Sequence, residues 1–151
     1  MKLILFLITS IFLNCYSSFA TASEINFDKY LSAFDYKERD EMKISAKELV
    51  ELLKKKQVQL VDIRFKEEYA LWKIEPSINI PINELPTSLN KLDKNKLIVT
   101  ACPHIDRASL ARHYLTLKGY KSKYLQDGLI KLMETEMRGD NALKLYQEMK
   151  K

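Results

Sequence analysis

Continuous apolar runs alternate along the chain with segments whose apolar positions recur every three or four residues. The runs are typical of buried β-strands, and the wider spacing is typical of helices that bury one face. Phe27, Tyr30, Leu31 and Phe34 stand at helical spacing, which predicts a short amphipathic helix. The polar residues 35–43 that follow are interpreted as a connection.

The rest of the chain follows a regular order of elements. Extended segments are expected from Ile44 and at 59–64, 78–80, 97–101 and 121–125. Helices are expected at 45–56, 66–72, 84–92 and 107–117, and after Gly128, where Gly139 splits the stretch and Asp140 caps a final helix. Alternating strands and helices predict an α/β fold with a mainly parallel central sheet and helices on both faces.

The beginning of the chain has the pattern of a secretory signal peptide. Lys2 precedes an apolar run at residues 3–13, and Ala20 and Ala22 provide the small residues of a cleavage site. We therefore expect cleavage after Ala22. The mature protein is then exported to the periplasm, or secreted, with no stable insertion in the membrane.

Two alternatives for this segment are weaker. A retained membrane anchor needs ~20 apolar residues, which is more than the run at 3–13 supplies. A lipoprotein would be acylated on Cys15, but Phe12, Leu13 and Asn14 match the usual Leu-x-small-Cys pattern poorly. Removing the signal peptide leaves residues 23–151, enough for one domain.

Charge and glycine content exclude two classes of function. The chain has 25 Lys+Arg against 20 Asp+Glu, and residues 54–56 form its basic run. This mild, scattered excess lacks the concentrated basic face of a nucleic-acid-binding protein, so no nucleic-acid partner is expected. Three glycines are too few for a glycine-rich phosphate loop.

Cysteine usage draws attention to one residue. The chain has two cysteines, and cleavage removes Cys15 and leaves Cys102. Exported proteins with structural disulfides carry cysteines in pairs. A lone thiol there is buried and inert, paired with another chain, or reactive.

Cys102 ends the clearest predicted strand, where ligands bind in open parallel sheets. A short loop, Pro103, His104, Ile105 and Asp106, leads to Arg107 at the start of a helix. Such a loop can direct backbone N–H groups and the positive end of the helix dipole at the sulfur. Together with Arg107 they favour a thiolate, so we expect a thiol pKa below about 8.5, with Asp106 opposing the shift.

The order of motifs resembles the single-domain rhodanese family. The Cys102-x4-Arg107 loop between strand and helix is similar to the active-site loop of that family. The other segments that carry the resemblance are residues 45–53, the strand 60–64, Glu67-Glu68-Tyr69, Ile78-Asn79-Ile80-Pro81, Gly119-Tyr120 and the turn at Gly128. The resemblance divides the chain into a signal peptide (1–22), an N-terminal helical extension (23–43), a rhodanese-like domain (44–133) and a C-terminal helix (134–151).

The resemblance implies sulfur transfer. Cys102 would take sulfane sulfur from a small sulfur-containing anion such as thiosulfate and pass it, as a persulfide, to a thiol or protein acceptor. Arg107 would stabilise the loop, the backbone of residues 104–107 would bind the persulfide, and Asp62 and Arg64 would support the pocket or hold neighbouring loops. No cofactor is implied, and no cluster of residues suggests a metal site.

The loop departs from the family pattern in two ways. Pro103 has no N–H, so the backbone cradle loses a donor. Asp106 adds negative charge where an anionic donor would approach. Two further hypotheses therefore stand beside the sulfurtransferase: a catalytically silent binding or regulatory module, and a thiol-redox protein that forms mixed disulfides with another chain.

Overall fold

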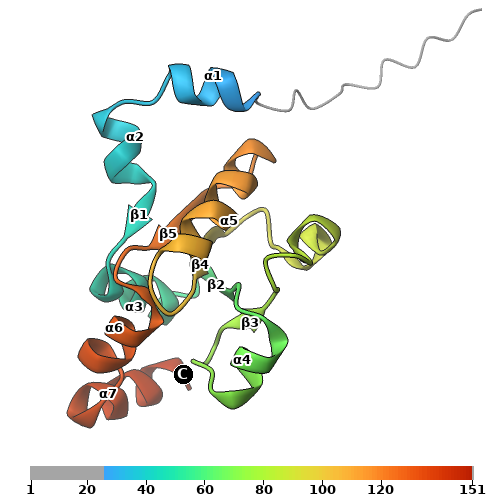
Figure 1. Ribbon diagram of the computed structural model, residues 1–151. Helices are drawn as coiled ribbons and strands as arrows, with labels where there is room; N and C mark the ends of the chain where they lie inside the picture. Colours follow the sequence, from blue (N-terminus) through green and yellow to red (C-terminus); the bar gives the residue numbers. More distant parts are fainter. Residues whose placement is uncertain (1–25, 151) are drawn as a thin grey trace, which may run out of the picture.

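The computed structural model describes residues 26–150 (Figure 1). The predicted signal peptide, its cleavage site and Cys15 lie outside this range. Within it, every helix is too short or too polar to cross a lipid bilayer.

Five parallel strands form one sheet in the order β1-β5-β4-β2-β3. Their bounds are β1 Lys43–Ile44, β2 Val58–Asp62, β3 Ile78–Asn79, β4 Leu97–Ala101 and β5 Ser122–Leu125. The central strand β4 pairs with β5 on one side and β2 on the other, and its residues 98–101 are buried. The parallel α/β fold expected from the alternation of strands and helices is thus confirmed.

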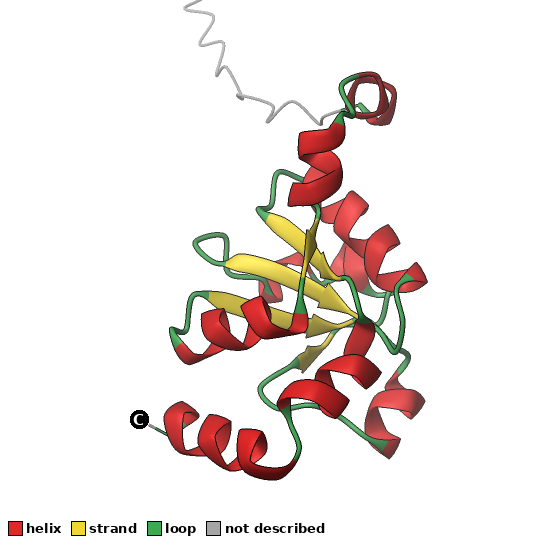
Figure 2. Ribbon diagram, turned by 90° about the vertical axis from the view of Figure 1, so that its left-hand side faces the viewer, coloured by secondary structure: helices red, strands yellow, loops and turns green. Residues whose placement is uncertain are grey.

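Helices lie on both faces of the sheet (Figure 2). They are α1 Phe27–Ser32, α2 Tyr36–Glu41, α3 Ala46–Lys54, α4 Lys66–Leu71, α5 Asp106–Leu117, α6 Gly128–Glu136 and α7 Gly139–Met149. One core cluster joins α3, α6 and α7 to one face, through residues such as Leu49, Leu129 and Leu145. The other joins α5 to the opposite face, through Ala108 and Leu115.

Local sequence signals explain where several elements begin and end. The Ser45 hydroxyl accepts a hydrogen bond from the Glu48 N–H at 3.2 Å and caps α3, as the sequence predicts. Gly119 has φ +80° just after α5, a left-handed conformation that glycine adopts without steric cost.

Three local expectations differ from the structure. Residues 36–41, expected as a connection, form α2, because the Asp35 carboxylate caps the helix through the Glu38 N–H at 2.8 Å. The expected helix at 84–92 is two 3₁₀ turns, Leu85–Thr87 and Leu89–Lys91. Asp140 is not a cap: it lies in the first turn of α7, where its charge suits the helix dipole.

The N-terminal helices contact the domain through a polar cluster on α5. The Arg112 guanidinium pairs with Glu38 of α2 at 2.6 Å and donates to the Tyr30 hydroxyl of α1 at 2.7 Å. Tyr30 also packs edge-on against His113, whose pKa burial lowers. His113 therefore packs at the contact between α1 and α5.

Candidate active site

Cys102 lies directly after β4, at the carboxyl end of the central strand of the sheet. The residue is a free thiol with 0% exposure. In the loop that follows, Pro103 is half-buried, whereas His104, Ile105 and Asp106 are exposed. The sequence thus predicts the position of the loop, and the structure adds that the loop and its neighbours close over the sulfur.

The start of α6 holds the loop from the other side. The Leu129 N–H donates to the Cys102 carbonyl at 2.8 Å, and the Ile130 N–H donates to the Pro103 carbonyl at 3.4 Å. Gly128, the first residue of α6, lies against the loop and has φ +71°. A Cβ at this position would lie 2.2 Å from the Pro103 oxygen and 2.5 Å from the His104 oxygen. Only glycine therefore allows α6 to approach the loop this closely.

Backbone and side-chain groups surround the sulfur. The backbone N–H groups of Ala108 and His104 interact with it and lower its pKa. The thiol donates a hydrogen bond to Asp106 Oδ1, with 3.6 Å between sulfur and oxygen. Of these two residues, His104 belongs to the segment 104–107 considered in the sequence, whereas Ala108 lies beyond it.

The expected low pKa of Cys102 is wrong. Burial raises the pKa of the thiol above its ordinary value, and the Asp106 carboxylate raises it further. Arg107 and the two N–H groups lower the pKa but do not compensate for lost hydration. The sequence shows the charges near the sulfur but not how completely the folded loop excludes water.

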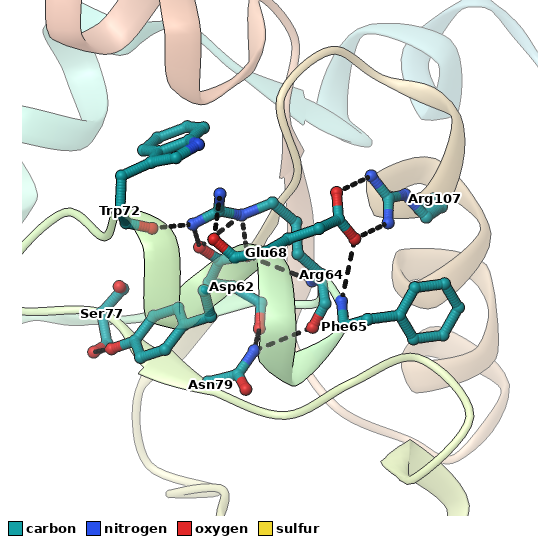
Figure 3. Close-up of polar contacts among 9 residues, drawn as sticks. Asp62, Arg64, Phe65, Glu68, Trp72, Ser77, Asn79 and Arg107 are labelled. Atoms are coloured by element: carbon teal, nitrogen blue, oxygen red, sulfur yellow. Dashed lines mark hydrogen bonds and ion pairs between the residues drawn. The ribbon is translucent and has the colours of Figure 1, made fainter.

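Arg107 forms an ion pair that the sequence did not predict (Figure 3). Its two terminal nitrogens donate to the Glu68 carboxylate of α4 at 2.6 and 2.9 Å. Glu68 also accepts a hydrogen bond from the Phe65 N–H at 3.1 Å. The pair raises the pKa of Arg107 and lowers that of Glu68. Arg107 therefore links the helix after the loop to α4, and Glu68 neutralises much of its charge.

Asp62 and Arg64 form a second, fully buried ion pair (Figure 3). Arg64 donates to the Asp62 carboxylate at 2.6 Å and to the Trp72 carbonyl at 2.7 Å, and its guanidinium lies 3.8 Å from the centre of the Trp72 ring. Asn79 donates to the carbonyls of both residues of the pair at 2.9 Å. These contacts connect β2, α4 and β3. They match the role of holding neighbouring loops that the sequence suggested for Asp62 and Arg64.

A pocket of about 220 Å³ opens beside the site, at the same edge of the sheet. It lies between the beginning of α4 and the segment after β3, and its lining residues are Phe65, Lys66, Glu67, Pro81, Asn83 and Glu84. Phe65 lies next to Arg107, with the guanidinium 5.8 Å from the ring centre. The pocket thus borders the Arg107–Glu68 pair, whereas Cys102 does not line it.

The fold and the loop after β4 define the class of protein. The family model of the Rhodanese-like domain matches residues 45–134. The chain belongs to this family.

Two curated proteins are similar to the chain. The thiosulfate sulfurtransferase GlpE of Shewanella oneidensis is 28% identical over 85 residues, which cover 56% of this chain and 84% of that protein. The tRNA uridine(34) hydroxylase of Buchnera aphidicola is also 28% identical, over 113 residues and 65% of this chain. The chain spans 36% of that hydroxylase.

Among solved structures, a rhodanese-related protein from Thermoplasma volcanium is 29% identical. It superposes with a TM-score of 0.56 over 61% of this chain and 90% of that one. The parallel sheet and its helices are thus shared with rhodanese-like proteins, and the curated relatives include a sulfurtransferase.

Proposed function

We propose that this chain is a sulfurtransferase that carries sulfane sulfur as a persulfide on Cys102. The observation that carries the proposal is the position of Cys102 directly after the central strand, in a loop where the backbone of His104 and Ala108 lowers the pKa of its thiol. The similarity to a thiosulfate sulfurtransferase supports it. Arg107 stabilises the arrangement by linking α5 to Glu68 of α4.

The proposed chemistry uses only the thiol and its surroundings. The Cys102 thiolate attacks the outer sulfur of a donor, a new S–S bond forms, and the donor fragment leaves with the electron pair of the broken bond. N–H groups directed at the sulfur stabilise negative charge on the persulfide. A thiol or protein acceptor then removes the sulfane sulfur and regenerates Cys102. Neither metal nor organic cofactor takes part.

The test is the mass of the purified protein after incubation with a sulfane-sulfur donor, either inorganic polysulfide, which is anionic, or cysteamine hydropersulfide, which carries a protonated amine. We expect a gain of one sulfur atom, removed by cyanide or by a thiol, in the wild type and in Cys15→Ser. The Cys15→Ser/Cys102→Ser variant should gain none, because serine cannot form a persulfide. Sulfur that persists in this double variant, or that never appears in the wild type, would contradict the proposal.

A catalytically silent binding module is the second candidate, and the burial of Cys102 favours it. A thiol with 0% exposure and a raised pKa is a poor nucleophile unless the loop opens. In this case the folded protein should take up no sulfur from either donor, whereas the protein unfolded in urea should react readily with both. The same mass measurement therefore separates the two candidates.

We further propose that the protein is exported to the periplasm, on the basis of the pattern in residues 1–22. Expression of the full chain in a Gram-negative host should yield periplasmic protein whose N-terminal residue is Ser23. Replacing Ala20 and Ala22 by leucine should block cleavage and retain the longer form. Acylation of Cys15, or mature protein that still contains residues 3–13, would contradict this proposal.

A further inference from the structure

The charges at the carboxyl edge of the sheet differ in sign from those of the chain as a whole. The chain has a formal net charge of +5. At the loop, however, Asp106 lies 3.6 Å from the Cys102 sulfur and is exposed to solvent. Asp127, also exposed, immediately precedes Gly128, which packs against the loop. The sulfur therefore lies in a locally acidic environment.

Arg107, in the first turn of α5, offsets this charge only in part. Arg107 is bound through both terminal nitrogens by Glu68, and only 26% of its side chain is exposed. Two of the five N–H donors of Arg107 are therefore already engaged by a carboxylate. The guanidinium of Arg107 is thus paired with Glu68, whereas no ion pair with Asp106 or Asp127 is found among the described residues.

This arrangement opposes an anionic donor. Thiosulfate is a dianion, and its approach to Cys102 brings it close to the Asp106 carboxylate. Like charges a few ångströms apart at a protein surface repel each other more strongly than they do in bulk water. Pro103 has no N–H with which to bind the anion. An uncharged or cationic donor meets no such barrier.

We propose that Asp106 sets the charge specificity of Cys102. The site takes sulfur from a sulfane-sulfur donor whose reacting end is uncharged or cationic. It discriminates against thiosulfate. The inference rests on the proposed sulfur-carrier function. The simplest donor of this class is an aminoalkyl hydropersulfide, R–S–SH, in which R carries a protonated amine.

The transfer from such a donor is balanced. The Cys102 thiol loses its proton to solvent, and the thiolate attacks the terminal sulfur of R–S–SH. The bond from Cys102 Sγ to that sulfur forms, and the S–S bond of the donor breaks. The electron pair leaves with R–S⁻, which takes up a proton from solvent. Cys102–SH and R–S–SH become Cys102–S–SH and R–SH, with no external oxidant or reductant.

Three methanethiosulfonate reagents test the inference: neutral methyl, cationic trimethylammonioethyl and anionic sulfonatoethyl. A thiolate attacks the same type of sulfur in each reagent and displaces the same methanesulfinate. Labelling is measured by mass on the tryptic peptide 97–107, which contains Cys102 and not Cys15. Each rate is divided by the rate with 2-mercaptoethanol, so that the intrinsic reactivity of the reagent cancels.

The full-length wild type should favour the cationic over the anionic reagent by about tenfold at low ionic strength, because the Asp106 carboxylate attracts the one reagent and repels the other. In Asp106→Asn the preference should fall about fivefold. Asp28→Asn is the control, because it makes the same change in net charge. Asp28 lies in α1, and α1 and α2 precede the amino end of β1. Cys102, in contrast, follows the carboxyl end of β4. This variant should keep the wild-type preference.

A second measurement needs no variant. Raising the ionic strength from about 0.01 M to about 1 M shortens the Debye length from roughly 30 Å to 3 Å and should reduce the preference of the wild type. A preference unchanged by both Asp106→Asn and salt overturns this inference, whereas sulfur uptake from polysulfide would leave the proposed function standing. If no reagent labels Cys102 in the folded protein, the inference fails, and the proposed function fails with it only if the sulfane-sulfur donors also leave the mass unchanged.

Discussion

Replacing Gly128 by alanine is expected to destabilise the protein by about 2 to 5 kcal/mol and to reduce persulfide formation on Cys102. Two costs combine at this position. The φ of +71° disfavours any residue with a Cβ, and this Cβ would lie 2.2 Å from the Pro103 oxygen and 2.5 Å from the His104 oxygen. Either the loop moves away from α6, which disturbs the groups around the sulfur, or the clash lowers the stability directly.

Gly119→Ala is the matched control. Gly119 also has a positive φ, +80°, but a Cβ added there would meet nothing within 4 Å. It should therefore show only the backbone cost of about 1 to 2 kcal/mol. The measurement is urea denaturation of both variants, with sulfur uptake from polysulfide measured on each. Equal losses of stability, together with unchanged sulfur uptake in Gly128→Ala, would contradict a specific role for Gly128 in holding the loop.

The layout of the fold follows from patterns that are local in the sequence. The expected strands at 59–64 and 97–101 correspond to β2 and β4, with β2 beginning one residue and ending two residues earlier, and the Ser45 cap begins α3 as expected. The helix at 36–41 has a weaker signal in the sequence. It has no apolar periodicity, and it depends on the Asp35 cap and on polar contacts such as that of Glu38 with Arg112.

The candidate site was predictable in position but not in electrostatics. The spacing of Cys102 and Arg107 indicates a loop between strand and helix, and the structure has one. The pKa of Cys102 depends on how much water the folded loop excludes, which no spacing reveals. The partner of Arg107 is Glu68, 39 residues away in sequence. The Glu67-Glu68-Tyr69 motif indicates that carboxylates lie on this helix, but it does not indicate which of the two pairs with Arg107.

The ion pair of Asp62 and Arg64 is where the largest loss of stability is expected. Both side chains have 0% exposure, and Arg64 satisfies the Asp62 carboxylate as well as the carbonyls of Glu68 and Trp72. Arg64→Met preserves most of the side-chain volume but leaves a buried carboxylate without a countercharge. Removing one partner of a buried pair typically costs about 3 to 5 kcal/mol. We expect a loss of this size in the free energy of unfolding from urea denaturation.

Arg39→Met provides the surface control, because Arg39 of α2 is 60% exposed and pairs with Asp40 at 3.5 Å. Exposed pairs contribute at most about 1 kcal/mol, so this variant should remain close to the wild type. Asp62→Asn should be destabilised as Arg64→Met is, since it leaves the guanidinium buried without its countercharge. The double variant Asp62→Asn/Arg64→Met should lose less than the sum of the two, because neither charge remains. Losses that simply add, or an Arg64→Met variant as stable as Arg39→Met, would show that the pair does not hold β2, α4 and β3 together.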